Sequence, residues 1–250
     1  MNAKANLALL STNHFDSGAL GMMAMVIHPF TEAGQYRGSV LRAGNVVGDL
    51  TFLVDESSSV MQLDIDLATV SLQKRQSGED CDCHAAPVPP ARVVSPRGFV
   101  LFYASGGSGY AVNVGHTSGK TRFDSTQLEK GDLFALSLLE PAQYEGTNAL
   151  TKARIDVAVE MLDGSPKELK ARFDALETAN VMVGGGFKPE KLRVVSAQGL
   201  VFQINEPSRI VISKKADSRQ SRGRGGPKAR WQKSVVPAPR GSEEAGVTRD

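Results

Sequence analysis

The chain is poor in several residue types that would each mark a familiar class of protein. Its 250 residues include only two cysteines, one tryptophan and four histidines, and aromatic residues make up 6%. Two cysteines cannot build a dense disulfide framework, so we expect thiols or metal ligands. No apolar run approaches the roughly 20 residues that a membrane-spanning helix needs. The sequence therefore predicts no membrane partner.

The first ten residues do not resemble an export signal. They contain one lysine and a short apolar stretch, Leu7 to Leu10, which polar residues interrupt from Ser11 onward. A secretory signal has an apolar core of about 7–15 residues. We therefore expect a cytoplasmic protein.

The chain does have glycine, 25 residues in all, and an internal repeat. The segment 33–39 (Ala-Gly-Gln-Tyr-Arg-Gly-Ser) resembles 141–147 (Pro-Ala-Gln-Tyr-Glu-Gly-Thr), and Gln35 and Gln143 are 108 residues apart. Apolar runs precede the two copies at 22–27 and 133–139, and alternating runs follow them at 48–54 and 154–159. Such a repeat of strand, tyrosine-bearing turn and strand indicates a duplicated β-protein.

The predicted fold class is mainly β, with two related antiparallel sandwich-like units, one short helix and a disordered C-terminal tail. We expect a first β unit over 1–72, a linker over 73–97, a second β unit over 98–215 and a tail over 216–250. The linker is predicted from its prolines, including Pro87, Pro89 and Pro90, because proline cannot donate within a central strand.

Local patterns predict the order of strands. The pattern of residues 20–72 predicts an antiparallel meander. Apolar and polar residues alternate from Met61 to Leu67, which is typical of a strand with one solvent-exposed face. A glycine-rich turn predicts a hairpin between 98–104 and 110–114. A second hairpin is expected between 191–195 and 200–204.

A single helix is predicted over about 166–178. Ser165 and Glu168 have capping-box spacing, and Pro166 falls at the first helical position. Leu169, Phe173 and Leu176 then recur at the spacing of an apolar helical face.

Two segments resemble parts of the cupredoxins, the small β-sandwiches that hold copper in electron carriers. The segment 131–144, Gly-Asp-Leu-Phe-Ala-Leu-Ser-Leu-Leu-Glu-Pro-Ala-Gln-Tyr, is similar to the strand and tyrosine turn of that family. The segment 187–194, with Gly199, Val201, Phe202 and Asn205, is similar to its Phe-x-Pro entry strand and the strand after it. The resemblance implies a sandwich fold.

The resemblance does not extend to the copper ligands. Asn148 stands where the family has its cysteine, and Val40 is its counterpart in the first repeat. No histidine follows His116, and the two motifs come in the opposite order. Because a blue-copper site needs two histidines and a thiolate, the resemblance implies no electron transfer.

The densest group of metal-ligand residues is Asp-Cys-Asp-Cys-His at 80–84. Cys81, Cys83 and His84 are ligand types that suit zinc or copper. A closed zinc site usually takes four ligands, from cysteine pairs two to four residues apart. The alternatives are therefore an exposed thiol pair and a metal or redox site.

The C-terminal segment is basic. Lys214 to Asp250 contains ten Lys or Arg and four Asp or Glu, whereas the whole chain has a net charge of +2. Few residues in it could build a core, which predicts disorder over 216–250. Its Arg-Gly-Arg-Gly-Gly stretch and tryptophan resemble segments that bind RNA through phosphate contacts and stacking. The candidate nucleic-acid-binding residues are Arg219, Arg222, Arg224, Lys228, Arg230, Trp231 and Lys233.

The sequence offers no catalytic constellation. Residues 115–121 (Gly-His-Thr-Ser-Gly-Lys-Thr) have three residues between the glycines where a phosphate-binding loop has four, so we expect a β-turn. We predict a non-enzymatic binding or assembly protein, with a protein partner or self-assembly and a polyanion such as RNA on the tail. No cofactor is expected. The alternative is a metal-handling or redox protein that uses Cys81, Cys83 and His84.

Overall fold

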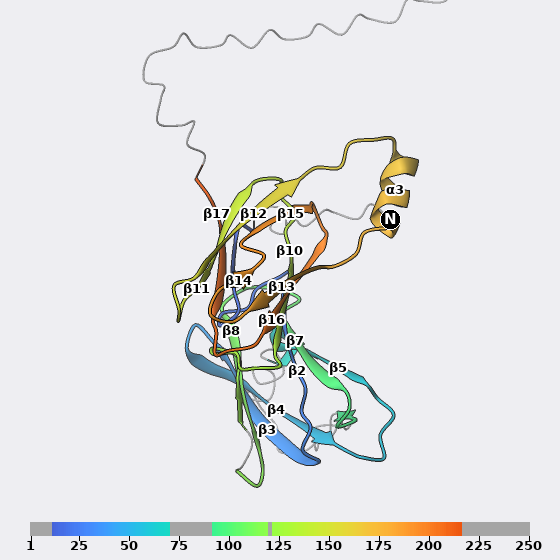
Figure 1. The fold of residues 1–250 in the computed structure, drawn as a ribbon. Coiled ribbons are helices and arrows are strands. Elements are labelled where there is room, and N and C mark those ends of the chain that lie inside the picture. Colours follow the sequence, from blue (N-terminus) through green and yellow to red (C-terminus); the bar gives the residue numbers. More distant parts are fainter. Residues whose placement is uncertain (1–11, 71–91, 120–121, 217–250) are drawn as a thin grey trace, which may run out of the picture. The chain divides into compact units, whose positions relative to one another are not determined.

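The computed structural model describes residues 12–70, 92–119 and 122–216 (Figure 1). All but the last of these residues belong to the first of the chain's two units, Met1–Lys215 and Ala216–Asp250. The described chain is mainly β, as the alternating sequence predicts, and its strands form three sheets.

The largest sheet, called here the central sheet, has seven strands in the order β14-β13-β16-β10-β2-β7-β5. Its strands are β2 (Ala24–His28), β5 (Gln62–Asp66), β7 (Phe99–Tyr103), β10 (Leu133–Ser137), β13 (Ala179–Val183), β14 (Phe187–Lys188) and β16 (Gly199–Ile204). One face carries the core, with Val26, Phe102, Phe134 and Phe202 completely buried. Alternate residues point to the other face.

Two five-stranded sheets contribute the rest of the core. The first outer sheet contains, in order, β6 (Val93–Val94), β4 (Asn45–Val54), β3 (Gly34–Arg42), β8 (Tyr110–His116) and β9 (Arg122–Asp124). The second outer sheet contains β15 (Lys191–Val195), β12 (Arg154–Glu160), β11 (Gln143–Asn148), β17 (Ile210–Lys214) and β1 (His14–Asp16). Their inward side chains and those of the central sheet form one apolar cluster.

The two outer sheets have the same construction. In each, a long antiparallel pair (β3–β4 or β11–β12) lies between a parallel edge strand (β6 or β15) and a further antiparallel pair (β8–β9 or β17–β1). The central sheet divides between β2 and β10 in the same manner, since β2-β7-β5 corresponds to β10-β16-β13. The protein thus has two related sandwich-like halves, here called the first half (β2 to β9) and the second half (β10 to β17, with β1).

Tyr36 and Tyr144, which were predicted in turns, lie instead near the starts of strands β3 and β11, at equivalent places in the two halves. Tyr36 on β3 and Tyr144 on β11 are both fully buried. The hydroxyl of Tyr36 donates to the carbonyl oxygen of Glu32 at 3.0 Å, and that of Tyr144 donates to Glu140 at 3.1 Å. Burial and the negative charge of Glu140 raise the pKa of Tyr144. The start of each strand is therefore fixed by a hydrogen bond to the carbonyl oxygen of the residue four positions earlier.

The predicted boundary at 73–97 does not divide the sheets. β2, from the predicted first unit, lies between β10 and β7, and β3 pairs with β8. Val93–Val94, inside the predicted linker, forms β6. The division between the halves falls later, between β9 and β10, and β1 alone crosses to the second half.

Several local pairings also differ from the predictions. The meander is absent from the described part of 20–72, because β2 and β5 lie in the central sheet while β3 and β4 lie in an outer sheet. The strands of each predicted hairpin, β7 with β8 and β15 with β16, belong to different sheets. Four pairs are parallel rather than antiparallel: β4–β6, β5–β7, β12–β15 and β13–β16. At these positions consecutive strands cross between sheets, whereas β3–β4, β8–β9 and β11–β12 pair with each other.

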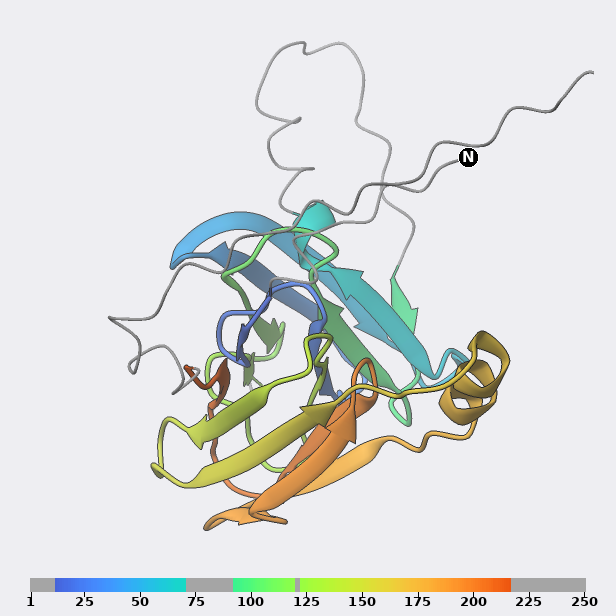
Figure 2. The ribbon, with the colours of Figure 1, turned by 90° about the horizontal axis from the view of Figure 1, so that it is seen from above.

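The predicted helix is present as α3 (Pro166–Asp174), four residues shorter than expected at its C-terminal end. Its start is fixed as predicted, because the Ser165 amide donates to the Glu168 carboxylate at 2.9 Å. The same bond lowers the pKa of Glu168. Phe173, expected on a buried face, is 42% exposed. Both views show α3 at the end of long connections, set apart from the sheets (Figure 2).

Candidate functional site

The residues predicted to bind metal or nucleic acid lie outside the described ranges. These are Cys81, Cys83 and His84 in segment 71–91, and Arg219, Arg222, Arg224, Lys228, Arg230, Trp231 and Lys233 in segment 217–250. Both sites therefore stay predictions. Among the residues that the structure describes, no group of three or more His, Cys, Asp or Glu could hold a metal ion. No helix in those ranges is long and apolar enough to cross a membrane.

A buried histidine–carboxylate pair lies where the halves meet. His28, at the end of β2, places Nδ1 2.5 Å from a carboxylate oxygen of Asp132, just before β10. The Asp132 side chain is 1% exposed, and its second oxygen accepts the amide of Glu129 at 2.7 Å. The His28 ring lies 4.4 Å from those of Phe30 and Phe123. Since both oxygens of Asp132 and the ring of His28 are engaged, the pair positions strands rather than a reacting group.

His116 closes the loop that resembles a phosphate-binding motif. Its carbonyl oxygen accepts the amide of Gly119 at 2.8 Å, and its Nδ1 lies 2.5 Å from the hydroxyl of Ser118. The ring packs edge-on against Tyr36, with centroids 4.9 Å apart. The other ring nitrogen is buried and has no hydrogen-bond partner among the described residues. This nitrogen faces Gly34, where an added Cβ would lie only 2.1 Å away. His116 is thus packed into a turn.

Asp66, one of the acidic residues on β5, organises backbone. It accepts hydrogen bonds from the amide of Ala68 and the hydroxyl of Thr69, at the start of the helical residues 67–70. It also accepts the amide and hydroxyl of Ser105. Burial acts to raise the pKa of Asp66, but these hydrogen bonds together lower it below its ordinary value. The carboxylate therefore caps a helix and fixes the loop after β7.

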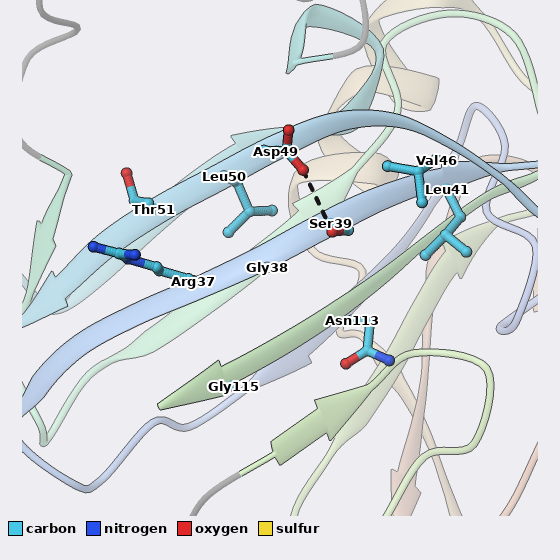
Figure 3. A pocket seen from close by; sticks show the side chains of 10 residues that line it. All are labelled: Arg37, Gly38, Ser39, Leu41, Val46, Asp49, Leu50, Thr51, Asn113 and Gly115. Carbon is cyan, nitrogen blue, oxygen red and sulfur yellow. Dashed lines mark hydrogen bonds between the residues drawn. The ribbon is translucent and has the colours of Figure 1, made fainter. Parts of the chain in front are cut away.

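An open groove runs over the outward face of the first outer sheet (Figure 3). Its volume is about 550 Å³, and it is lined by polar and apolar side chains of β3, β4 and β8. In the close-up the hydroxyl of Ser39 points toward Asp49, to which it donates at 3.4 Å. Asn113 and Gly115 of β8 also line the groove, and the side-chain oxygen Oδ1 of Asn113 accepts a hydrogen bond from the guanidinium of Arg122 at 3.2 Å. Because the groove is shallow and mixed in character, it defines no particular ligand chemistry.

The outward face of the central sheet is markedly apolar. On β16, β10, β2 and β7, Ser137 and Gln203 are polar residues that point away from the core, but most residues on this face are aliphatic or aromatic and partly exposed. In strand order these apolar residues are Phe99, Leu101 and Tyr103 on β7, Met25 and Ile27 on β2, Leu133 and Ala135 on β10, and Val201 on β16. Ile27 lies directly between Leu101 and Leu133 in the sheet register. We call these eight residues the apolar face.

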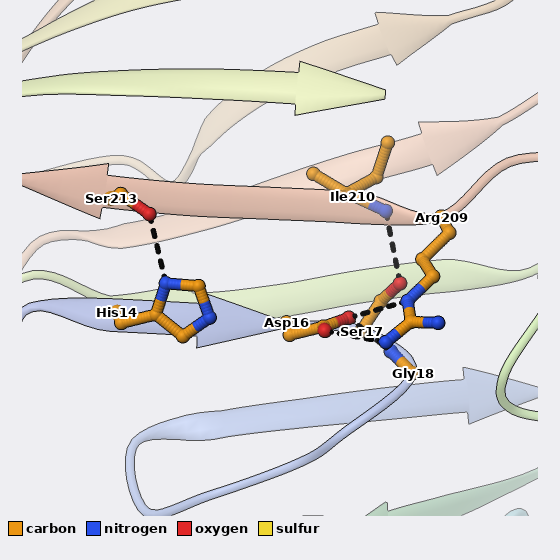
Figure 4. Close-up of polar contacts among 7 residues, drawn as sticks. All are labelled: His14, Asp16, Ser17, Gly18, Arg209, Ile210 and Ser213. Atoms are coloured by element: carbon orange, nitrogen blue, oxygen red, sulfur yellow. Dashed lines mark hydrogen bonds and ion pairs between the residues drawn. The ribbon is translucent and has the colours of Figure 1, made fainter. Parts of the chain in front are cut away.

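The second outer sheet is completed by a strand from the other end of the described chain. β1 pairs with β17, and His14 lies opposite Ser213 while Phe15 lies opposite Ile212. The ring nitrogen Nδ1 of His14 is 2.8 Å from the Ser213 hydroxyl (Figure 4). Phe15 is 4% exposed and joins the core.

An ion pair fastens this strand. The guanidinium of Arg209 donates to both carboxylate oxygens of Asp16, at 3.0 and 2.7 Å, a bidentate geometry that strengthens the contact (Figure 4). The bond to Asp16 raises the pKa of Arg209. The amide of Gly18 also donates to Asp16 at 2.8 Å. A Cβ added at Gly18 would come within 2.8 Å of the Arg209 side chain, so glycine makes room for the arginine.

Ser17 makes two hydrogen bonds to the backbone of Ile210. Its amide donates to the carbonyl oxygen of Ile210 at 2.9 Å, and its hydroxyl accepts the amide of Ile210 at 3.0 Å. Ser125 makes the same pair of bonds with Val112, at 3.0 and 2.9 Å. The edge strands of the two halves are thus attached in the same way.

The sequence carries this equivalence in a motif that the predictions above do not use. Residues 15–20 read Phe-Asp-Ser-Gly-Ala-Leu and residues 123–128 read Phe-Asp-Ser-Thr-Gln-Leu, again 108 residues apart. Leu20 exchanges two backbone hydrogen bonds with Tyr110, and Leu128 exchanges two with Ser208. A search of the sequence at the 108-residue offset of Tyr36 and Tyr144 would have found this motif.

Neither a protein-family model, nor a curated protein, nor a solved structure matches this chain. The cupredoxin resemblance therefore stays a prediction. The fold itself is that of a β-sandwich protein with two halves and a largely apolar outward sheet face.

Proposed function

We propose that this protein is a non-enzymatic assembly protein that pairs with a second copy of itself through the apolar face. The observation that supports this most is the continuity of that face across four neighbouring strands from both halves. Contiguous exposed apolar patches of this kind often mark interaction sites. A flat sheet face also packs well against another sheet face.

The dimensions of the central sheet suit such an interface. Six of its strands have five or six residues, and at about 4.8 Å between strands and about 3.4 Å per residue they span roughly 29 by 17 Å. The accessible surface of a pleated sheet exceeds its flat area, and a standard interface buries about 800 Å² per partner. The central sheet can therefore supply nearly a whole interface.

The charges at the two margins of the sheet favour a second copy over an unrelated partner. Asp64, on the edge strand β5, is exposed and shares the face of Leu101. Lys188, on the opposite edge strand β14, is exposed and shares the face of Met182. A two-fold axis parallel to the strands would set β5 of one copy over β14 of the other, so that Asp64 meets Lys188 twice.

The test introduces a charge into the centre of the apolar face. Ile27→Glu should convert the dimer to a monomer of 26.7 kDa, as measured by size-exclusion chromatography with light scattering. The matched control is Leu53→Glu, which places the same charge at a 38% exposed leucine on the outward side of β4; it should leave the dimer intact. A wild-type protein that is monomeric at all concentrations, or equal effects of the two variants, would overturn the proposal.

A second role concerns the basic tail, on the strength of its charge. We propose that Arg219 to Lys233 bind RNA or another polyanion, independently of the folded unit. Removal of the chain after Ala216 preserves the contacts of Lys214 with Glu140 and of Lys215 with Asp156. This truncated protein should fold as before and lose RNA binding, whose affinity in the full chain should fall steeply with salt, with a log–log slope of about −0.7 per phosphate neutralised. Equal RNA affinity of the full and truncated chains would show that the tail is not the RNA-binding segment.

The metal alternative rests on Cys81, Cys83 and His84 and has an equally direct test. Elemental analysis of protein purified without chelator should find no stoichiometric zinc or copper if assembly is the function. Metal that disappears in the Cys81→Ser/Cys83→Ser variant would favour the metal-handling alternative instead.

A further inference from the structure

β1 in the second half and β9 in the first half differ in how the chain connects each of them to the strand beside it. β9 follows β8 after residues 117–121. β1 and β17, by contrast, are joined by contacts between residues more than 190 positions apart, such as Ser17 with Ile210. The β1–β17 interface therefore needs no short tether, and its geometry would be the same if the two strands came from different chains.

The connection from β1 to β2 contains a pivot. Ser17 is bound to Ile210 in the second half, whereas Leu20, three residues later, is bound to Tyr110 in the first half. Between these anchors lie Gly18 and Ala19. Glycine tolerates backbone rearrangement that other residues resist, so β1 can leave β17 while the chain from Leu20 onward keeps its contacts.

The attachment of β1 is also small and specific. Besides the backbone pairing of three strand residues, it includes one buried ring, the bonds of Ser17 with Ile210, the contact of His14 with Ser213 and the Asp16–Arg209 ion pair. A short strand held by a few directional contacts is released more readily than a long one, and the free β17 edge then offers unpaired backbone groups to another strand. The strand that fits this edge best has the sequence Phe-Asp-Ser, because each of these side chains has a formed partner there.

We propose that the β17 edge accepts β1 from a second copy of the chain, so that two copies exchange their Phe-Asp-Ser strands. Exchange of an identical element re-forms the contacts between β1 and β17 with strands from two chains. It uses the edge of the second outer sheet, whereas the apolar face lies on the central sheet, and it is therefore independent of pairing through that face.

A charge swap tests the exchange. In Asp16→Arg the strand meets a like charge on its own Arg209, and in Arg209→Asp the site meets a like charge from its own Asp16. When these two chains are refolded together, an exchanged heterodimer restores an opposite-charge pair at both junctions. Native mass spectrometry should show at least about tenfold more heterodimer for this mixture than for Asp16→Arg refolded with the wild type, since a bidentate ion pair is worth about that factor.

The controls separate exchange from pairing through the apolar face. Association through the apolar face would give the same amount of heterodimer in both mixtures, and that equality would overturn the exchange. The double variant Asp16→Arg/Arg209→Asp restores the pair within one chain, and it should show no preference for the complementary partner chains. Loss of the apolar face by Ile27→Glu should leave the preference of the charge-swapped mixture unchanged.

A disulfide trap gives a second measurement with milder variants. His14 and Ser213 lie directly opposite each other across the β1–β17 pair, a separation that a disulfide can span. One chain carrying His14→Cys and another carrying Ser213→Cys, both with Cys81→Ser and Cys83→Ser, should form a covalent heterodimer after joint refolding and oxidation. The chain that carries both new cysteines should form the bond internally. A mixture that yields no covalent heterodimer, while the internal bond forms, would overturn the proposal.

Discussion

The two halves place the same Phe-Asp-Ser motif at the edge of the same kind of sheet, yet they hold it differently. In the first half Asp124 accepts the amide and the hydroxyl of Thr126 and has Ala111 at the position that Arg209 occupies in the second half. In the second half Asp16 accepts the amide of Gly18 and the guanidinium of Arg209. The half whose edge strand lacks a short covalent connection is the half with the ion pair.

This difference has a simple thermodynamic reading. A short loop keeps β9 near β8 at little entropic cost, whereas ordering β1 on β17 closes a loop of nearly the whole described chain. The extra cost is a few kcal/mol at most, because loop-closure entropy grows only slowly with length. A bidentate, partly exposed ion pair is of the right size to offset part of it.

The junction between the halves shows a second contrast. At one end of the β2–β10 pair, His28 lies beside Asp132. At the other end, Ala24 lies opposite Leu136. The first pair is polar and the second apolar, although both belong to the same antiparallel ladder. A polar pair at one end discriminates between correct and shifted strand registers, because only the correct register satisfies the buried carboxylate.

The largest expected effect tests whether the halves are equivalent in their cores. Tyr36→Ala and Tyr144→Ala each empty a fully buried site, and each should lower the free energy of unfolding by about 3–5 kcal/mol. Tyr→Phe at either position should cost about 1 kcal/mol, since only the hydrogen bond to the glutamate carbonyl is lost. Urea denaturation measures all four variants. A loss at one tyrosine at least twice that at the other would break the equivalence.

How far the sequence predicts this fold depends on the range of the signal. The start of α3 followed from Ser165, Pro166 and Glu168, because capping is a contact between near neighbours. The strands themselves followed from alternation. Their partners did not, because β5–β7 and β13–β16 are parallel pairs whose register depends on matching buried faces across sheets rather than on a turn.

The sites followed the same rule. The Phe-Asp-Ser motif stands in the sequence at the same offset as the tyrosines, so its repetition was accessible. Its partner Arg209 was not, since 193 residues separate it from Asp16 and no local pattern links them. His28 and Asp132 were likewise indistinguishable from ordinary turn residues until the central sheet placed β2 beside β10.

A middle-sized effect concerns Asp66, for which the second half has a different residue. The registers of β5 and β13 place the exposed Met182 at the equivalent position. Asp66→Ala should lower the free energy of unfolding by about 2–3 kcal/mol, because a helix cap and the bonds from Ser105 are lost. Met182→Ala should change it by no more than about 0.5 kcal/mol.

The same carboxylate predicts a pH dependence. The folded state lowers the pKa of Asp66, so its contribution is fully present above the unfolded pKa of about 3.9 and is lost as the pH falls through the folded value. The difference in unfolding free energy between the wild type and Asp66→Asn should therefore shrink as the pH is lowered below about 4. A difference that stays constant from pH 7 to pH 3 would contradict the role of the ionised carboxylate.

The smallest expected effect isolates the ion pair that distinguishes the two edges. Asp16→Ala and Asp124→Ala each remove an aspartate that accepts the amide two residues later, so the loss of that turn contact is common to both. Only Asp16→Ala also removes the bond to Arg209. Its cost in unfolding free energy should exceed that of Asp124→Ala by about 1 kcal/mol, and the excess should decrease in high salt because the guanidinium is 38% exposed. Adding Arg209→Ala to the Asp16→Ala variant should then lower the free energy of unfolding only slightly further. Equal losses from the two aspartates, or an excess that high salt leaves unchanged, would mean that the fold holds β1 by its backbone and its phenylalanine alone.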